Sequence, residues 1–190
     1  MQDHSPQAAN NIRSAAEIVA FWRDAGPDKW FDKNAGFDAV IRARFLPTYE
    51  AAAAGKLKGW ENTAEGTLAL LILLDQFPRN MFRGDPRTYA SDALAREVAG
   101  RAIDRGADRR IDPMLLEFLY MPFMHSEALA DQLRCVELFR KTDNEENQKY
   151  AEGHADIVRR FGRFPHRNRL LGRATTADEQ AFLDGGGFSG

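Results

Sequence analysis

The segment Thr67–Leu74, TLALLILL, is the most apolar stretch of this chain and restricts its fold more than any other feature. It is far too short to span a bilayer, which needs about 20 apolar residues. A helix that is apolar on every side must be buried on every side. We therefore expect a central helix enclosed by other helices, with Asn62 as its N-cap. Pro78 is expected to stop it, because proline lacks an amide donor and clashes with the preceding turn.

The rest of the chain also has helical character. No run of alternating apolar and polar residues is bounded by turns, and alanine and leucine outnumber β-branched residues, which favours an all-α fold. Capping boxes at Ser14–Glu17 and Thr176–Glu179 mark the starts of the first and last helices. Short turns between the helices predict stacked antiparallel pairs in a degenerate helical-repeat array. The helices expected between the two boxes cover residues 38–54, 91–104, 113–119, 126–141 and 143–162, with a loop over residues 26–37.

The length of 190 residues fits one domain. We expect a disordered segment at residues 1–12, a single helical domain at residues 13–184 and a flexible tail at residues 185–190. The one cysteine, Cys135, excludes a disulfide framework and a cysteine-based zinc site, and is expected to be a small packing residue. No signal peptide is visible, so a cytoplasmic location is expected.

Two turns repeat the order phenylalanine, proline, arginine, asparagine: FPRN at Phe77–Asn80 and FPHRN at Phe164–Asn168. We expect phenylalanine and proline to fix a helix exit, and Asn80 and Asn168 to take turn or left-handed geometry. Asp75 ends the apolar helix, where burial without a partner is costly and the helix dipole disfavours an anion. A cation must therefore face Asp75, and both turns offer arginines: Arg79, Arg83, Arg160, Arg163 and Arg167.

The second turn is especially rich in arginine. Residues 159–173 contain six arginines, one histidine and no acid, interleaved with apolar residues that favour burial. Guanidinium groups held among buried rings need nearby carboxylates or an anionic ligand to neutralise them. Two interpretations stay open. The arginines can lock helix pairs together through bridges to Asp75 and other carboxylates, or they can line a pocket for an anion.

A third polar cluster, HSEALADQ, covers His125–Gln132. We expect Ser126 to cap the following helix and Glu127 to lie in its first turn. His125 and Glu127 are two residues apart, which points them away from each other on a helix, so no metal site is expected. The ordinary pKa of histidine makes His125 a candidate acid or base, although a lone histidine at a helix start is more often structural. His154 lies on an apolar stripe and is expected in the core.

Four stretches together resemble a single family: FWRDAGPDKWF, LLILLDQFPRNMFRG, YMPFMHSEALADQ and RFGRFPHRNRLLGR. They are similar to the bacterial family called domain of unknown function 924, over about residues 18–183. The resemblance implies a fold like that of tetratricopeptide-repeat proteins, with antiparallel helix pairs stacked in a right-handed superhelix. It also implies a set of signature residues: Asp75, Gln76, Arg79, Asn80, Arg83, His125, Glu127, Gln132, Arg163, His166, Arg167, Asn168 and Arg173. The family has no established activity.

Two functions from different classes fit these residues. A binding module would take an anionic small molecule or an acidic peptide segment on its concave face. The expected ligand-binding residues are Arg79, Asn80, Arg83, Gln132, Arg163, Arg167, Asn168 and Arg173. A small hydrolase- or lyase-type enzyme acting on an anionic metabolite would use His125 or His166 as acid or base, oriented by Asp75 or Glu127. No cofactor, metal or membrane is expected, and the net charge of −2 disfavours nucleic acid.

Overall fold

The computed structural model describes residues 12–188, and all regular elements in that part of the chain are helical. The prediction of an all-α chain is confirmed. The disorder expected at residues 1–11 and the end of the expected tail, residues 189–190, lie outside the described residues. The α-helices are α1 Ala15–Ala25, α2 Pro27–Trp30, α3 Ala35–Ala53, α4 Ala64–Leu71, α5 Phe77–Met81, α6 Asp92–Asp104, α7 Glu117–Met124, α8 Leu129–Phe139, α9 Glu145–Phe161 and α10 Ala177–Asp184.

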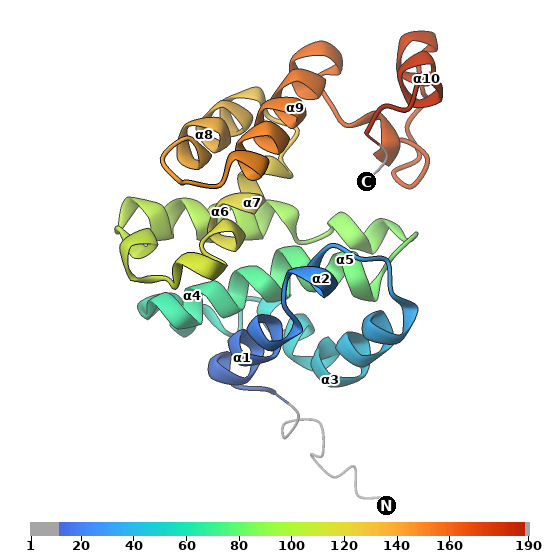
Figure 1. The fold of residues 1–190 in the computed structure, drawn as a ribbon. Helices are drawn as coiled ribbons and strands as arrows, with labels where there is room; N and C mark the ends of the chain where they lie inside the picture. The colour runs from blue at the N-terminus through green and yellow to red at the C-terminus, as the bar shows by residue number, and fades with distance from the viewer. Residues whose placement is uncertain (1–11, 189–190) are drawn as a thin grey trace, which may run out of the picture.

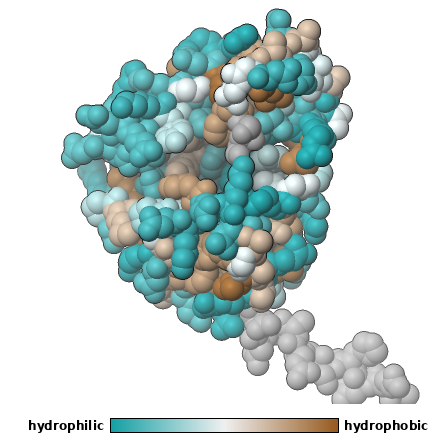
Figure 2. Space-filling view, turned by 45° about the vertical axis from the view of Figure 1, so that its right-hand side comes forward, coloured by the Kyte–Doolittle hydropathy of each residue, from teal (hydrophilic) through white to brown (hydrophobic). Residues whose placement is uncertain are grey.

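The helices pack largely against their neighbours in the chain. Helix α1 contacts α4 and α3 contacts α5, and α4, α6, α7, α8 and α9 follow one another as a continuous series of contacts. Helices α1 and α3 lie on one side of the molecule and α8 and α9 on the other, with α10 beyond the end of α9 (Figure 1). This order is compatible with the predicted stack of antiparallel pairs, whose superhelical hand stays a prediction. Figure 2 shows that one face is hollowed, with hydrophobic residues in the hollow among hydrophilic ones.

The apolar segment is enclosed, as predicted: residues 66–78 are all buried. Its N-cap is Thr63 rather than the predicted Asn62, because the Thr63 hydroxyl accepts a hydrogen bond from the Gly66 amide at 3.0 Å. Only glycine fits at position 66, since a Cβ there would lie 2.2 Å from the Trp60 carbonyl oxygen. Of the helices within residues 12–188, none is both long and apolar enough to cross a membrane.

The prediction that Pro78 ends the apolar helix is wrong. The chain passes through a π-helical turn, Ile72–Gln76, into α5. Pro78 cannot donate to the carbonyl oxygen of Leu74, four residues earlier, and the Ser91 hydroxyl donates to that oxygen instead at 2.6 Å. A π-helical turn is a local widening of the kind that accommodates a disturbed hydrogen-bond ladder. The helix therefore continues to Met81 because a residue from another element satisfies the free carbonyl.

Replacing Ser91 with alanine is expected to lower the free energy of unfolding by about 1–3 kcal/mol, because it leaves the buried Leu74 carbonyl without a donor. Ser91 is itself only 3% exposed, so water cannot easily replace the hydroxyl. The measurement is urea unfolding of wild type and variant at pH 7. A change within about 0.5 kcal/mol, the range of ordinary surface substitutions, would show that the carbonyl finds another donor.

Several helix starts differ from the prediction because of local capping. Helix α3 begins three residues early, since the Asn34 side chain accepts from the Phe37 amide at 3.0 Å. The predicted loop before it contains the short helix α2. The helix predicted over residues 113–119 is a 3₁₀ turn, Pro113–Leu115, followed by α7, which continues through Pro122 to Met124.

Helix α8 begins at Leu129, three residues after the predicted cap. Ser126 is not its N-cap: the Ser126 hydroxyl accepts from the Ala128 amide and donates to Asp131. Glu127 consequently lies before the helix rather than in its first turn. This position frees its carboxylate to reach the second arginine-rich turn.

The prediction of left-handed or turn geometry is wrong for Asn80, whereas Asn168 does lie in a turn, over residues 168–172. Within residues 12–188 no residue other than glycine has a positive φ. Asn80 lies inside α5, and Asn168 has helical backbone angles. Gly84 and Gly172, each four residues after an asparagine, take the left-handed conformation with φ of 81° and 64°.

Candidate functional site

Asp75 is the centre of a buried polar cluster, and the cation predicted to face it is present. The Asp75 carboxylate is completely buried. It lies 2.8 Å from Nδ1 of His125 and 3.4 Å from Nη1 of Arg79, and accepts from the Gln76 amide at 2.6 Å. Burial opposes ionisation of Asp75, but Arg79 and His125 outweigh it and lower its pKa to about 2. Asp75 is therefore an ionised carboxylate inside the protein, facing the positive charge of Arg79.

Both terminal nitrogens of Arg79 donate hydrogen bonds to neighbouring groups. Its two terminal nitrogens donate to both oxygens of Asp92, each at 3.0 Å, and Nη1 also donates to the carbonyl oxygen of Asp75. This two-pronged contact is the strong geometry for an arginine–carboxylate pair. Arg79 thus ties α5 to the first turn of α6 and occupies both oxygens of Asp92.

Arg167 reaches the same carboxylate from the second turn but is held differently. Its Nη1 lies 3.6 Å from Asp92, and the guanidinium carbon lies 4.5 Å from the ring centroid of Tyr89 and 4.6 Å from that of Phe164. The side chain is only 8% exposed, and Nε is buried without a hydrogen-bond partner. Among residues 12–188, no group accepts a hydrogen bond from this guanidinium. Arginine has five N–H donors, so this one keeps its hydrogen-bonding capacity unused.

Three further predicted arginines are neutralised by carboxylates from distant parts of the chain. Each makes two hydrogen bonds to one carboxylate, at 2.6–3.1 Å. The pairs are Arg83 with Asp38, Arg163 with Glu179, and Arg173 with Glu127. The interpretation of the arginines as a structural lock therefore describes these three pairs.

The predicted amide side chains belong to the same framework. Asn80 donates to Asp38 at 2.8 Å and Asn168 donates to Glu179 at 3.2 Å, so each asparagine strengthens one of the arginine pairs. Gln132 is fully buried and donates to three carbonyl oxygens at and beyond the end of α7, those of Phe123, Met124 and Ser126. These side chains fix helix ends and do not converge with Arg167.

The two candidate histidines differ in their partners. His125 is 17% exposed at its side chain and faces Asp75. Within residues 12–188, no carboxylate forms a hydrogen bond or ion pair with His166, and its Nδ1 is buried without a partner. Burial and the charge of Arg79 lower the pKa of His125 despite the nearby Asp75, which favours the neutral ring. Its Nδ1–H then donates to Asp75, and Nε2 is left with a free lone pair. Glu127 accepts from the Phe164 amide at 2.8 Å and pairs with Arg173, so it does not orient either histidine.

His154 lies in the core, as predicted, and forms an aromatic group with residues of the second turn and the C-terminal segment. Its ring lies 5.4 Å from that of Phe164 and 4.5 Å from that of Phe188, and the ring of His166 lies 5.1 Å from Phe188. Burial lowers the pKa of His154 to about 4 and that of His166 to about 3. Among the described residues, no group of three or more histidine, cysteine, aspartate or glutamate side chains is placed to hold a metal ion.

The lowered pKa values of His154 and His166 predict a loss of stability in mild acid. In the unfolded chain each histidine takes up a proton near its ordinary pKa of about 6.5, whereas the folded protein keeps both neutral until about pH 4 and 3. Their contribution is therefore complete above pH 6.5 and is lost as the pH falls toward 4. The free energy of unfolding, measured by urea at pH 7.5, 6.5, 5.5 and 4.5, is expected to fall over this interval. The decline should be shallower in His166→Gln, and an equal slope in both proteins would contradict the assignment.

Two residues of the cluster were not anticipated from the sequence. Asp92 binds Arg79 and lies beside Arg167, and Tyr89 stacks on Arg167. Asp92 stands at the start of α6, where an acidic residue is ordinary, so its sequence position carries no signal of a tertiary partner. Tyr89 lies in a short 3₁₀ turn between α5 and α6, and only the folded arrangement brings it to Arg167.

Comparison with known proteins places the chain in a family. The sequence profile of a bacterial protein family of unknown function, domain of unknown function 924, matches residues 18–187. The structure of a protein of unknown function from Agrobacterium tumefaciens is 50% identical in sequence, with a TM-score of 0.87, and the match covers 90% of this chain and 97% of that chain. No curated protein matches the chain. The chain belongs to the bacterial family called domain of unknown function 924.

Proposed function

We propose that this protein binds an anionic ligand, through a carboxylate or phosphate group, at Arg167. The observation that carries the proposal is the guanidinium held between the rings of Tyr89 and Phe164 with its hydrogen-bond donors unused. A planar guanidinium matches carboxylate and phosphate oxygens in a two-pronged contact. The two rings fix its plane in advance, so little side-chain freedom is lost on binding.

The electrostatic surroundings of Arg167 favour an anion. Both oxygens of Asp92 accept hydrogen bonds from Arg79, whereas Arg167 approaches Asp92 only to 3.6 Å. Burial and the positive charge of Arg79 lower the pKa of Arg167, which means that its charge is incompletely compensated. An anion beside Arg167 would compensate the guanidinium charge, and so would offset the effects of burial and of Arg79 on the pKa of Arg167. The side chain of Arg79, which shares Asp92 with Arg167, is 21% exposed, which supports access from solvent.

Under this proposal the other arginines act as a framework. Arg83, Arg163 and Arg173 are each satisfied by a carboxylate and hold the helices that position Arg167. The ligand class covers a small carboxylate or phosphate and the acidic side chain or terminus of a peptide segment, because all present the same group to a guanidinium.

Calorimetric titration with inorganic phosphate and with acetate tests the proposal. We expect wild type to bind at least one of these probes and Arg167→Gln to bind it more than tenfold more weakly. The matched control is Arg169→Gln, which removes the same charge from an exposed position two residues away. Equal weakening in both variants would show that binding depends on net charge and not on a site at Arg167, which would overturn the proposal. Absence of binding to wild type would overturn it as well. Thermal melting of each variant separates lost binding from lost folding.

A second candidate function is acid–base catalysis by His125, which the contact with the buried Asp75 carboxylate favours. The carboxylate would hold the Nδ1–H tautomer and leave Nε2 to accept a proton from a substrate or water. Hydrolysis of p-nitrophenyl phosphate and p-nitrophenyl acetate provides a first screen. Activity that disappears in His125→Gln and persists in Arg169→Gln would support the enzyme, and activity unchanged in His125→Gln would exclude His125 from catalysis.

A further inference from the structure

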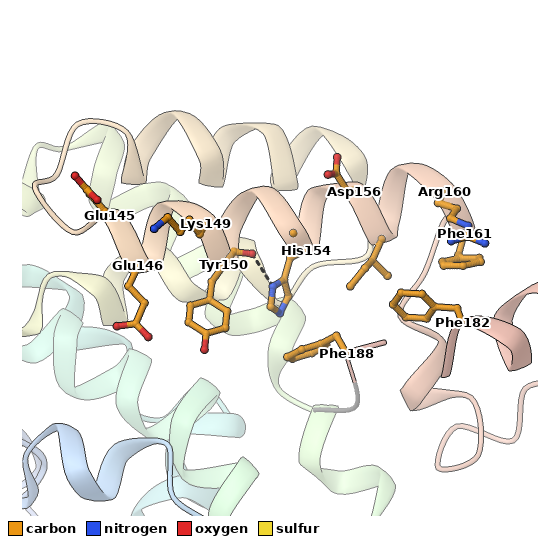
Figure 3. A pocket seen from close by; sticks show the side chains of 12 residues that line it. Glu145, Glu146, Lys149, Tyr150, His154, Asp156, Arg160, Phe161, Phe182 and Phe188 are labelled. Atoms are coloured by element: carbon orange, nitrogen blue, oxygen red, sulfur yellow. Dashed lines mark hydrogen bonds between the residues drawn. The ribbon is translucent and has the colours of Figure 1, made fainter. Parts of the chain in front are cut away.

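A groove of about 910 Å³ lies along α9, beside the C-terminal segment (Figure 3). Tyr150, Ile157 and Phe161 of α9 are spaced so that they share one face of the helix. Phe182 and Phe188 complete the apolar lining from the C-terminal segment. In Figure 3, Tyr150 and His154 extend toward Phe188, and Phe161 and Phe182 lie close together at the other end.

This apolar face is separate from the one that holds α9 in the fold. Ala151, Ala155 and Val158 are buried, and α9 packs on α8. Tyr150 and Phe188, in contrast, are 51% and 36% exposed. Monomeric proteins seldom leave several large apolar side chains together in a concave surface unless that surface binds something.

Charged side chains distinguish the two ends of the groove. Glu145 and Glu146 lie at the end where α9 begins, with Lys149 between them and the apolar lining. At the opposite end the Arg160 guanidinium lies 4.6 Å from the ring centroid of Phe161 and 5.9 Å from that of Phe182.

Arg160 differs from its neighbours in lacking a carboxylate. Arg159 pairs with Asp156 and Arg163 pairs with Glu179. Within residues 12–188, no carboxylate forms an ion pair or hydrogen bond with Arg160. The end of the groove near Phe161 therefore presents an unpaired cation against two aromatic rings.

We propose that the groove binds a small amphipathic anion, with its apolar body on the aromatic and aliphatic lining and its one acidic head group on Arg160. The volume of about 910 Å³ lies within the usual range for small-molecule sites, about 300–1,000 Å³. Glu145 and Glu146 would repel a second acidic group, so they favour a ligand whose other end is uncharged. None of the contacts of Arg167 lines this groove, so the inference stands independently of the anion site proposed above.

The test uses dodecanoate as the ligand probe, measured by its displacement of the fluorescent anion 8-anilinonaphthalene-1-sulfonate from the full-length protein. Gly153 lies in the lining, and a Cβ there would meet no atom within 4 Å. Gly153→Phe can therefore fill the groove without straining the fold, and it also removes the helix penalty of glycine. We expect this variant to bind dodecanoate more than tenfold more weakly while its melting temperature stays equal to or above that of wild type.

A second variant tests the head group. Arg160→Gln is expected to weaken dodecanoate about tenfold and to leave the binding of dodecanol, which has no charge, unchanged. The matched control is Arg169→Gln, which removes the same charge from an exposed position outside the lining and should bind both probes like wild type. Unchanged dodecanoate binding in Gly153→Phe, or tighter binding of dodecyltrimethylammonium than of dodecanoate, would overturn the proposal. Arg167→Gln should leave all these values unaltered, which separates this result from the test of Arg167.

Discussion

Replacing Asp75 with alanine is expected to lower the free energy of unfolding by about 3–5 kcal/mol, the range typical of removing one partner from a buried ion pair. Asp75 is fully buried and contacts Arg79 and His125, whose side chains would lose their common anion. Gln76 would lose its acceptor as well. Urea unfolding at pH 7 measures the loss, and the variant should unfold at a clearly lower urea concentration.

An exposed ion pair supplies the control for Asp75. Arg140 and Glu152 pair at 2.8 Å, but their side chains are 60% and 50% exposed. Solvent screens such a pair, so Glu152→Ala should change the free energy of unfolding by only about 0–1 kcal/mol. Equal losses for Asp75→Ala and Glu152→Ala would contradict the central position given to the buried carboxylate.

Replacing Phe164 with alanine is expected to cost about 3–5 kcal/mol of folding free energy, because it removes a large ring from the interior and leaves a cavity. The Phe164 ring is 0% exposed and packs against His154, His166 and Arg167. The same change removes one of the two rings that hold the Arg167 guanidinium. Thermal and urea unfolding measure the loss of stability, and phosphate titration measures the loss of anion binding that follows from removing this ring.

Two further variants separate the two roles of Phe164. Phe164→Leu restores most of the buried volume but not the flat ring, so it should recover much of the stability without recovering anion binding. Phe31→Ala removes a ring that is 58% exposed and should cost far less than Phe164→Ala. If Phe164→Leu binds phosphate as tightly as wild type, the ring does not position Arg167.

The features that were predicted correctly are those whose physical cause lies within a few residues. The capping boxes at Ser14–Glu17 and Thr176–Glu179 each satisfy two amides through side chains three residues apart, and both are present. The need for a cation at Asp75 followed from the cost of burying a lone carboxylate, and Arg79 lies one helical turn away.

The failures have distant causes. Pro78 does not stop the helix because Ser91, in another element, donates to the carbonyl that proline leaves free. Ser126 does not cap α8 because its hydroxyl bonds to Asp131 and to the Ala128 amide. Asp92 was missed because the two arginines beside it come from positions 79 and 167, and only tertiary packing brings them together.

The repeated order of phenylalanine, proline, arginine and asparagine has a common structural meaning in both turns. Phe77 and Phe164 are fully buried, and the asparagine of each turn donates to a carboxylate of another element. Both arginines approach Asp92. They differ because Arg79 donates to both oxygens of Asp92, whereas Arg167 donates to neither. The pair of turns therefore builds one arginine in a two-pronged contact with Asp92 and one whose guanidinium has no hydrogen-bond acceptor within residues 12–188.

A crystal structure grown with sodium selenate is the sharpest test of anion binding at Arg167, because selenium scatters anomalously and marks a bound tetrahedral anion without ambiguity. We expect an anomalous peak within hydrogen-bond distance of the Arg167 guanidinium, beside Tyr89. An empty Arg167 with Asp92 turned fully onto it, in crystals where other arginines bind selenate, would contradict this expectation. The two turns would then be a structural lock alone.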